Sequence, residues 1–82
     1  MEDERILRLM DEKDVIVMID GVGDYTYKIF QREDCKCYAV VVYETDDESV
    51  DVARTKNQSN WAKAKADALS VIEKHRMIRH SK

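Results

Sequence analysis

Residues 37–43 constrain the fold of this chain more than any other segment. They read Cys-Tyr-Ala-Val-Val-Val-Tyr, so an extended strand here carries non-polar side chains on both of its faces. Such a strand is typical of the centre of a sheet, where neither face is open to water. The run is rich in β-branched and aromatic residues and is far too short to span a bilayer. The chain must therefore supply strands to flank this segment and an element to cover it.

Two strands are predicted before this central segment. Residues 15–19, Val-Ile-Val-Met-Ile, form a β-rich non-polar run that predicts a buried strand. Residues 20–24, Asp-Gly-Val-Gly-Asp, interrupt the pattern as a hairpin connection does. Residues 25–31 then alternate, which assigns two sets of side chains to opposite faces, Tyr25, Tyr27 and Ile29 on one and Thr26, Lys28 and Phe30 on the other.

The segment after the central strand is an acidic loop, residues 44–49. Residues 50–55 follow, and they predict a fourth strand with Val50 and Val52 directed inward. The pattern is short, so three strands and four strands both remain open from the sequence.

The last element is a long helix from Asn60 to about Ile78, with Ser59 or Asn60 as its N-cap. Helical spacing predicts one buried stripe, in which Trp61 packs against the edge of the core. The stripe consists of Trp61, Ala64, Ala68, Val71, Ile72 and His75.

A shorter helix is predicted over residues 2–13, with Ile6, Leu7, Leu9 and Met10 as its non-polar stripe. The first five residues carry a net negative charge and precede no long non-polar run, so we expect no signal peptide. No run in the chain is long enough for a membrane span, and we expect no membrane partner.

These elements predict a single α+β domain over residues 1–82. An N-terminal helix is followed by a three- or four-stranded antiparallel sheet and by a long C-terminal helix packed on that sheet. Because the connections between strands are short, a meander is the simplest topology.

The residues that usually carry catalysis or bind cofactors form no recognisable motif. Cys35 and Cys37 are too close in sequence for a structural zinc site, and they have no third cysteine as a partner. Gly21 and Gly23 lack the third glycine of a dinucleotide loop. We therefore expect no enzyme, no metal and no cofactor. The two free thiols predict a reducing, cytoplasmic location.

Charge is divided by position along the chain. Residues 1–52 hold fifteen acidic and six basic residues, whereas residues 53–82 hold two acidic and eight basic residues. The division defines two candidate binding surfaces. The acidic surface comprises Glu44, Asp46, Asp47, Glu48 and Asp51, and the basic surface comprises Arg54, Lys56, Lys63 and Lys65.

The basic residues at the start of the last helix, with a helix, strands and a final helix in that order, resemble the outline of the double-stranded RNA-binding domain. That resemblance implies phosphate contacts by Lys63 and Lys65. The small size, the acidic first half and the lack of a catalytic set resemble the small acidic proteins with which phages disable host or defence machinery.

Three functions follow as hypotheses. The first is an inhibitor or modulator whose acidic surface competes with nucleic acid for a basic nucleic-acid-binding protein, in the manner of a DNA mimic. The second is a small RNA- or DNA-binding module that uses the basic surface. The third is a homodimeric structural module in which residues 37–43 pair across a sheet edge and the two charged halves dock head to tail.

Overall fold

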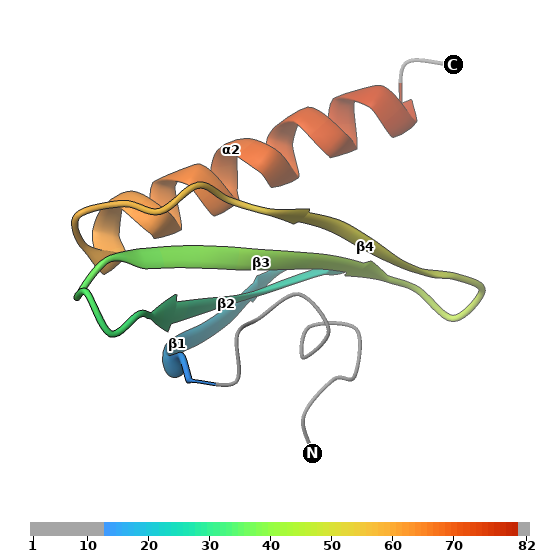
Figure 1. The fold of residues 1–82 in the computed structure, drawn as a ribbon. Helices are drawn as coiled ribbons and strands as arrows, with labels where there is room; N and C mark the ends of the chain where they lie inside the picture. The colour runs from blue at the N-terminus through green and yellow to red at the C-terminus, as the bar shows by residue number, and fades with distance from the viewer. Residues whose placement is uncertain (1–12, 81–82) are drawn as a thin grey trace.

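A computed structural model describes residues 13–80. Four strands precede one long helix in the order β1 (Val15–Val22), β2 (Tyr25–Gln31), β3 (Cys37–Glu44), β4 (Ser49–Arg54) and α2 (Trp61–His80). The strands form one antiparallel sheet in sequence order, a meander, and α2 lies across one face of it (Figure 1). The predicted α+β class and the fourth strand are confirmed. The N-terminal helix predicted over residues 2–13 lies outside the described residues except for Lys13, which is in a turn.

The connections explain why the strands pair in sequence order. β1 and β2 are joined by Gly23 and Asp24, and Gly23 has a φ of 58°. A positive φ at the first of two loop residues is the geometry of a type II′ hairpin, which glycine adopts at little cost. Between β2 and β3, the N–H of Cys35 donates to the carbonyl of Arg32 and Cys35 itself has a φ of 66°. Both turns are tight, so consecutive strands have little choice of partner.

β3 is the central strand that its sequence predicts. It pairs with β2 on one side and with β4 on the other, and its residues from Cys37 to Val42 are all buried. A homodimer formed by pairing residues 37–43 across an edge is therefore wrong, because neither edge of β3 is open. The edges of the sheet are β1 and β4.

The predicted buried strand at residues 15–19 is an edge strand instead. Val15, Val17 and Ile19 of β1 are 58%, 45% and 56% exposed. The register of β1 against β2 shifts between Ile16 and Met18, so Val17 is an extra residue in a bulge. Hydrophobicity and β-propensity predict a strand but do not say whether a second neighbour will pair with it, which is why the sequence misplaced β1 in the sheet.

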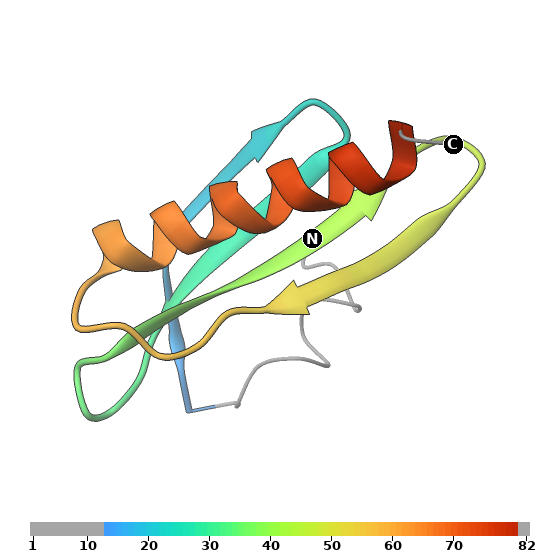
Figure 2. The ribbon, with the colours of Figure 1, turned by 90° about the horizontal axis from the view of Figure 1, so that it is seen from above.

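The core under the helix contains the side chains that the alternation predicts. Tyr25, Tyr27 and Ile29 of β2 are buried in one cluster with Ala64, Ala68 and Ile72 of α2. The small alanines allow the helix to approach β2 and β3 closely, and Figure 2 shows α2 running over these central strands. Val52 packs against this cluster as predicted, whereas Val50 is 36% exposed.

Trp61 departs from its predicted place in the core, since it is 51% exposed. The helix begins at Trp61 because the Asn60 side chain accepts a hydrogen bond of 3.0 Å from the N–H of Lys63, the contact of an N-cap. A residue in the first helical turn lies at the end of the contact with the sheet, so helical spacing alone overstates its burial.

The linker between β4 and α2 continues along β3. Cys37 and Gln58 exchange two backbone hydrogen bonds, and the Thr55 hydroxyl accepts a bond of 2.8 Å from the N–H of Ala39. The Gln58 amide also donates to Asp67 of α2 at 2.6 Å. These contacts hold the start of the helix at the β2–β3 end of the sheet, so its C-terminal turns extend toward the β3–β4 loop. None of the helices in the described part of the chain is long and non-polar enough to cross a membrane.

Candidate functional site

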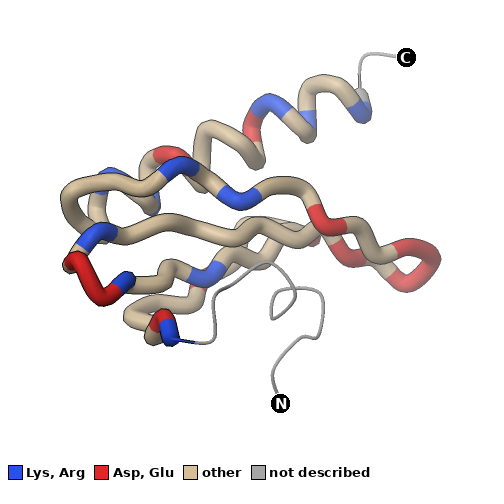
Figure 3. The backbone as a smooth tube through the Cα atoms, in the orientation of Figure 1, with Lys and Arg blue, Asp and Glu red and all other residues tan. Residues whose placement is uncertain are grey.

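One end of the molecule collects the predicted acidic residues. Figure 3 shows Asp and Glu gathered on the β3–β4 loop, whereas Lys and Arg are spread over α2, the linker and the strands. Four carboxylates line an open depression of about 570 Å³ together with Thr45. They are Asp24, Glu44, Asp46 and Asp47. We call these four residues the acidic end.

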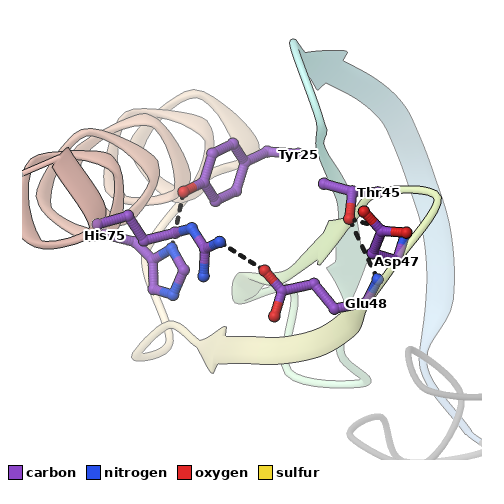
Figure 4. A network of polar contacts seen from close by, with 6 residues as sticks. Tyr25, Thr45, Asp47, Glu48 and His75 are labelled. Carbon is purple, nitrogen blue, oxygen red and sulfur yellow. Dashed lines mark hydrogen bonds and ion pairs between the residues drawn. The ribbon is translucent and has the colours of Figure 1, made fainter.

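The shape of this loop depends on Thr45. Its hydroxyl accepts hydrogen bonds from the N–H groups of Asp47 and Glu48 at 3.3 and 3.1 Å, and its own N–H donates to the carbonyl of Glu48 (Figure 4). The N–H of Glu44 donates to the carbonyl of Asp24 at 2.9 Å. The backbone therefore fixes the β1–β2 turn beside the β3–β4 loop. The sequence places Asp24 among the acidic residues in the loops of the sheet but does not say that it lies at this end, because it precedes Glu44 by twenty positions.

Two of the predicted acidic residues differ from the rest. Glu48 accepts a charge-assisted hydrogen bond from Arg79 of α2, so its charge is already matched within the chain. Asp51 lies farther along β4, opposite Val42, and does not line the depression. Of the five predicted acidic residues, Glu44, Asp46 and Asp47 thus lie around one depression, and Glu48 and Asp51 do not line it.

An aromatic cluster adjoins the acidic end under the last turns of the helix. Tyr25 Oη and His75 Nδ1 share a hydrogen bond of 2.7 Å (Figure 4). The rings of Tyr25 and Tyr43 lie 4.8 Å apart between centroids. The guanidinium of Arg79 lies 4.4 Å from the centroid of the Tyr43 ring. Burial, and then the neighbouring Tyr43, raise the pKa of Tyr25 above its ordinary value. Tyr25 therefore keeps its proton at neutral pH.

A pocket of about 310 Å³ opens between this cluster and the β1–β2 turn. Asp24, Tyr25, Tyr43, Arg76 and Arg79 line it with the turn backbone. Arg76 is also paired with Glu73 on the helix surface at 2.6 Å. The described residues that line the pocket include no Ser, Thr, Cys or Lys. The pocket combines the Tyr43 ring with the nearby carboxylate of Asp24. Arg79 is held by groups of the same two kinds, the Tyr43 ring and the Glu48 carboxylate.

The four predicted basic residues do not form one surface. The guanidinium of Arg54 lies 3.9 Å from the centroid of the Tyr38 ring, on the sheet face opposite α2. Lys56 lies beside α2 in a groove that also contains Lys74 and Asp67. Lys63 and Lys65 are in the first two turns of the helix. A single stretch of nucleic acid along α2 would therefore not reach Arg54.

Cys35 and Cys37 lie apart from His75 in the described part of the chain. Cys35 is exposed in the β2–β3 turn, and Cys37 is buried under the helix. His75 contacts Tyr25 and Tyr43 at the other end of the sheet. Within residues 13–80, no three His, Cys, Asp or Glu residues are placed to hold one metal ion.

Comparison of the chain with known protein families, with curated proteins and with solved structures finds no match. The arrangement of its own residues is therefore the basis for the proposals that follow.

Proposed function

We propose that this chain is a non-enzymatic binding protein whose acidic end docks on a basic nucleic-acid-binding protein and competes there with nucleic acid. The observation that carries the proposal is the convergence of Asp24 with Glu44, Asp46 and Asp47 around one open depression. Two loops that are distant in sequence present their carboxylates at the same end of the molecule. Such a local concentration of charge raises the rate of encounter with a basic partner.

The contact between Glu48 and Arg79 supports arginine as the residue that this end would recognise. The Arg79 guanidinium is bonded to the Glu48 carboxylate and lies over the Tyr43 ring. Planar guanidinium groups pair with carboxylates and stack on aromatic rings better than lysine does. The surroundings of Arg79 are therefore a model, within one chain, of how the acidic end would hold a partner's arginine.

The proposed mode of action is displacement of nucleic acid from the partner. Carboxylates that occupy the phosphate-binding groups of a partner displace its nucleic acid without chemistry, as a DNA mimic does. This is also how the small acidic phage inhibitors, which the chain resembles in size and charge, would be expected to act. The interaction should weaken strongly as salt is added, because exposed charges are screened within about 10 Å at 0.1 M salt.

Displacement of a labelled duplex tests the proposal. A fluorescent DNA duplex is bound to each of a panel of basic DNA-binding proteins, and anisotropy is followed as the chain is added at low and at high salt. We expect release of the duplex from at least one member of the panel at low salt. Release should fall by about tenfold or more in potency for Asp46→Asn/Asp47→Asn, since each charged contact contributes about 1 kcal/mol or more.

A matched control is available at the opposite end of the sheet. Glu33→Gln/Asp34→Asn removes the same charge from the exposed β2–β3 turn, so general electrostatic attraction predicts equal weakening by both double variants. Docking through the acidic end predicts that only Asp46→Asn/Asp47→Asn weakens release of the duplex. No release from any panel member, or equal effects of the two pairs, would contradict the proposal. Direct binding of the duplex by the chain, lost in Lys63→Glu/Lys65→Glu, would favour the nucleic-acid-binding alternative.

A further inference from the structure

The two edge strands of the sheet differ in the polarity of their exposed side chains. β4 presents exposed charged residues, Asp51 and Arg54, along its six residues. β1 presents non-polar side chains on both faces of the sheet, since Val15, Val17 and Ile19 are about half exposed, and no described strand pairs with its outer side. Charged edges resist pairing with another strand, whereas a non-polar edge invites it. β1 is therefore the edge suited to a partner.

A non-polar groove runs beside this edge. Val17 and Met18 of β1 and Trp61 of α2 line a depression of about 380 Å³. Leu69, two helical steps of four residues beyond Trp61, is also exposed. The helix packs mainly on β2 and β3, so it covers the helix-side face of β1 only in part, at Met18 and Val22. The bulge at Val17 explains how two consecutive residues, Val17 and Met18, both reach the groove.

We propose that β1 pairs antiparallel with β1 of a second copy of this chain, which joins the two sheets into one around a two-fold axis. Backbone groups along the outer side of β1 would bond to the same groups of the second copy. In an antiparallel sheet the axis is perpendicular to the sheet, so both α2 helices lie on the same face. The two grooves then face each other across the axis, and each Trp61 loses contact with water.

Charge favours a second copy in this orientation. Lys13 precedes β1, and Asp20 lies near its end. Antiparallel pairing brings Lys13 of each copy toward Asp20 of the other, whereas parallel pairing would place like charges together. The nearby Asp14 is turned into the protein, where its carboxylate accepts a hydrogen bond from the Tyr38 hydroxyl. Pairing of β1 with β4 of another copy is disfavoured because it would place the charged residues Asp51 and Arg54 at the interface. Such pairing would also be head-to-tail and would produce an open-ended fibre.

The oligomeric state of the full chain tests this proposal. Sedimentation over a wide range of concentrations should show a monomer–dimer equilibrium. Trp61 is the only tryptophan of the chain, so its emission should shift to shorter wavelength in step with dimerisation. Ile19→Lys should weaken the dimer by at least about tenfold, because a lysine at the pairing edge costs about 1.4 kcal/mol or more. The matched control is Val50→Lys on β4, which should leave the dimer unchanged.

The orientation is tested by exchanging the two charges. Lys13→Glu should weaken the dimer, and addition of Asp20→Lys should restore it. Circular dichroism of every variant checks that the fold is retained. A chain that stays monomeric at all concentrations would overturn the proposal, as would an Ile19→Lys chain that dimerises as well as the parent. Dimerisation that is lost in Val50→Lys would assign the interface to β4 instead. The acidic end is not involved in any of these outcomes, so they do not depend on the function proposed above.

Discussion

The two faces of the sheet are both buried, but different kinds of contact bury them. The face under α2 is completed by one regular element, whose Ala64, Ala68 and Ile72 pack on β2 and β3. The opposite face buries Phe30, Tyr38, Val40 and Val42, and the described groups that meet it come from separate places in the chain. They are Ile16 of β1, the carboxylate of Asp14 and the guanidinium of Arg54.

The difference shows two ways in which a small domain covers a sheet. A helix with a non-polar stripe supplies many hydrophobic contacts at once, with the Tyr25–His75 hydrogen bond beside them. On the opposite face, the buried carboxylate of Asp14 accepts a hydrogen bond from the Tyr38 hydroxyl, and a buried polar group is stabilising only while its partner is present. The helix face should therefore respond strongly to lost volume, and the opposite face, whose non-polar side chains are also fully buried, should respond to a lost hydrogen bond as well.

The largest expected effect is on the helix face. Ile72→Ala removes a fully buried side chain at the centre of the contact between α2 and the sheet. We expect the free energy of unfolding to fall by about 2–5 kcal/mol, from lost transfer energy and the cavity left behind. Urea unfolding followed by circular dichroism measures it. Leu69→Ala, on the exposed side of the same helix, should change stability far less, and equal losses would contradict the central place of Ile72.

The next effect is expected on the opposite face. Tyr38→Phe keeps the ring under Arg54 but removes the hydroxyl that donates to the buried carboxylate of Asp14. Loss of this hydrogen bond to a buried carboxylate should lower the free energy of unfolding by about 1–3 kcal/mol. A double-mutant cycle with Asp14→Ala checks the cause. If the two losses simply add, the hydrogen bond is not what holds Asp14 in place.

Alkaline pH should destabilise the helix face, because two buried groups with raised pKa values, Tyr27 and Cys37, lie there. Burial, and then Asp20, raise the pKa of Tyr27 above its ordinary value, and burial also raises the pKa of Cys37. Both groups are neutral in the folded core, so their contribution is complete below the unfolded-state pKa and is lost as pH rises through the folded-state pKa. Stability should therefore fall above about pH 9–10. Tyr27→Phe should reduce that fall in unfolding measured at neutral and alkaline pH, and an unchanged fall would exclude Tyr27 as a cause.

The smallest expected change in stability is in the turn between β2 and β3, which belongs to neither face of the sheet. Cys35 is exposed and has a φ of 66°, a conformation that costs a non-glycine residue about 1 kcal/mol. Cys35→Gly should therefore raise the free energy of unfolding by up to about 1 kcal/mol, reduced by the greater freedom of glycine in the unfolded chain. Thermal unfolding measures the change, and Cys35→Ala serves as the control that removes the thiol but keeps the strain.

Periodicity predicted the arrangement of β2, β3 and α2 well. The alternation of residues 25–31 and the spacing of Ala64, Ala68 and Ile72 report directly which side chains face the core. Asn60 was one of two N-caps that the sequence allowed, and the structure selects it. The surroundings of a residue in the middle of an element are set by its own neighbours in sequence, which is why these predictions hold.

The predictions that failed concern residues at the margins of elements. Val15, Val17 and Ile19 have the composition of a buried strand but lie at an edge, and Trp61 has the spacing of a core residue but lies in the first turn of the helix. Burial at a margin depends on whether another element reaches that far. That is decided by the lengths and directions of distant segments, about which the local pattern says nothing.

The features of the candidate site likewise fall into those that the sequence determines and those that depend on packing. The sequence alone determined that the β3–β4 loop is acidic, that charge is segregated and that the fold is a meander under a helix. Only the tertiary structure decided that Asp24 joins the acidic end, that Arg79 neutralises Glu48 and that Arg54 lies on the far face from Lys63. The physical reason is that charge and hydrophobicity are carried by each residue, whereas proximity is created by the way in which the strands and the helix pack.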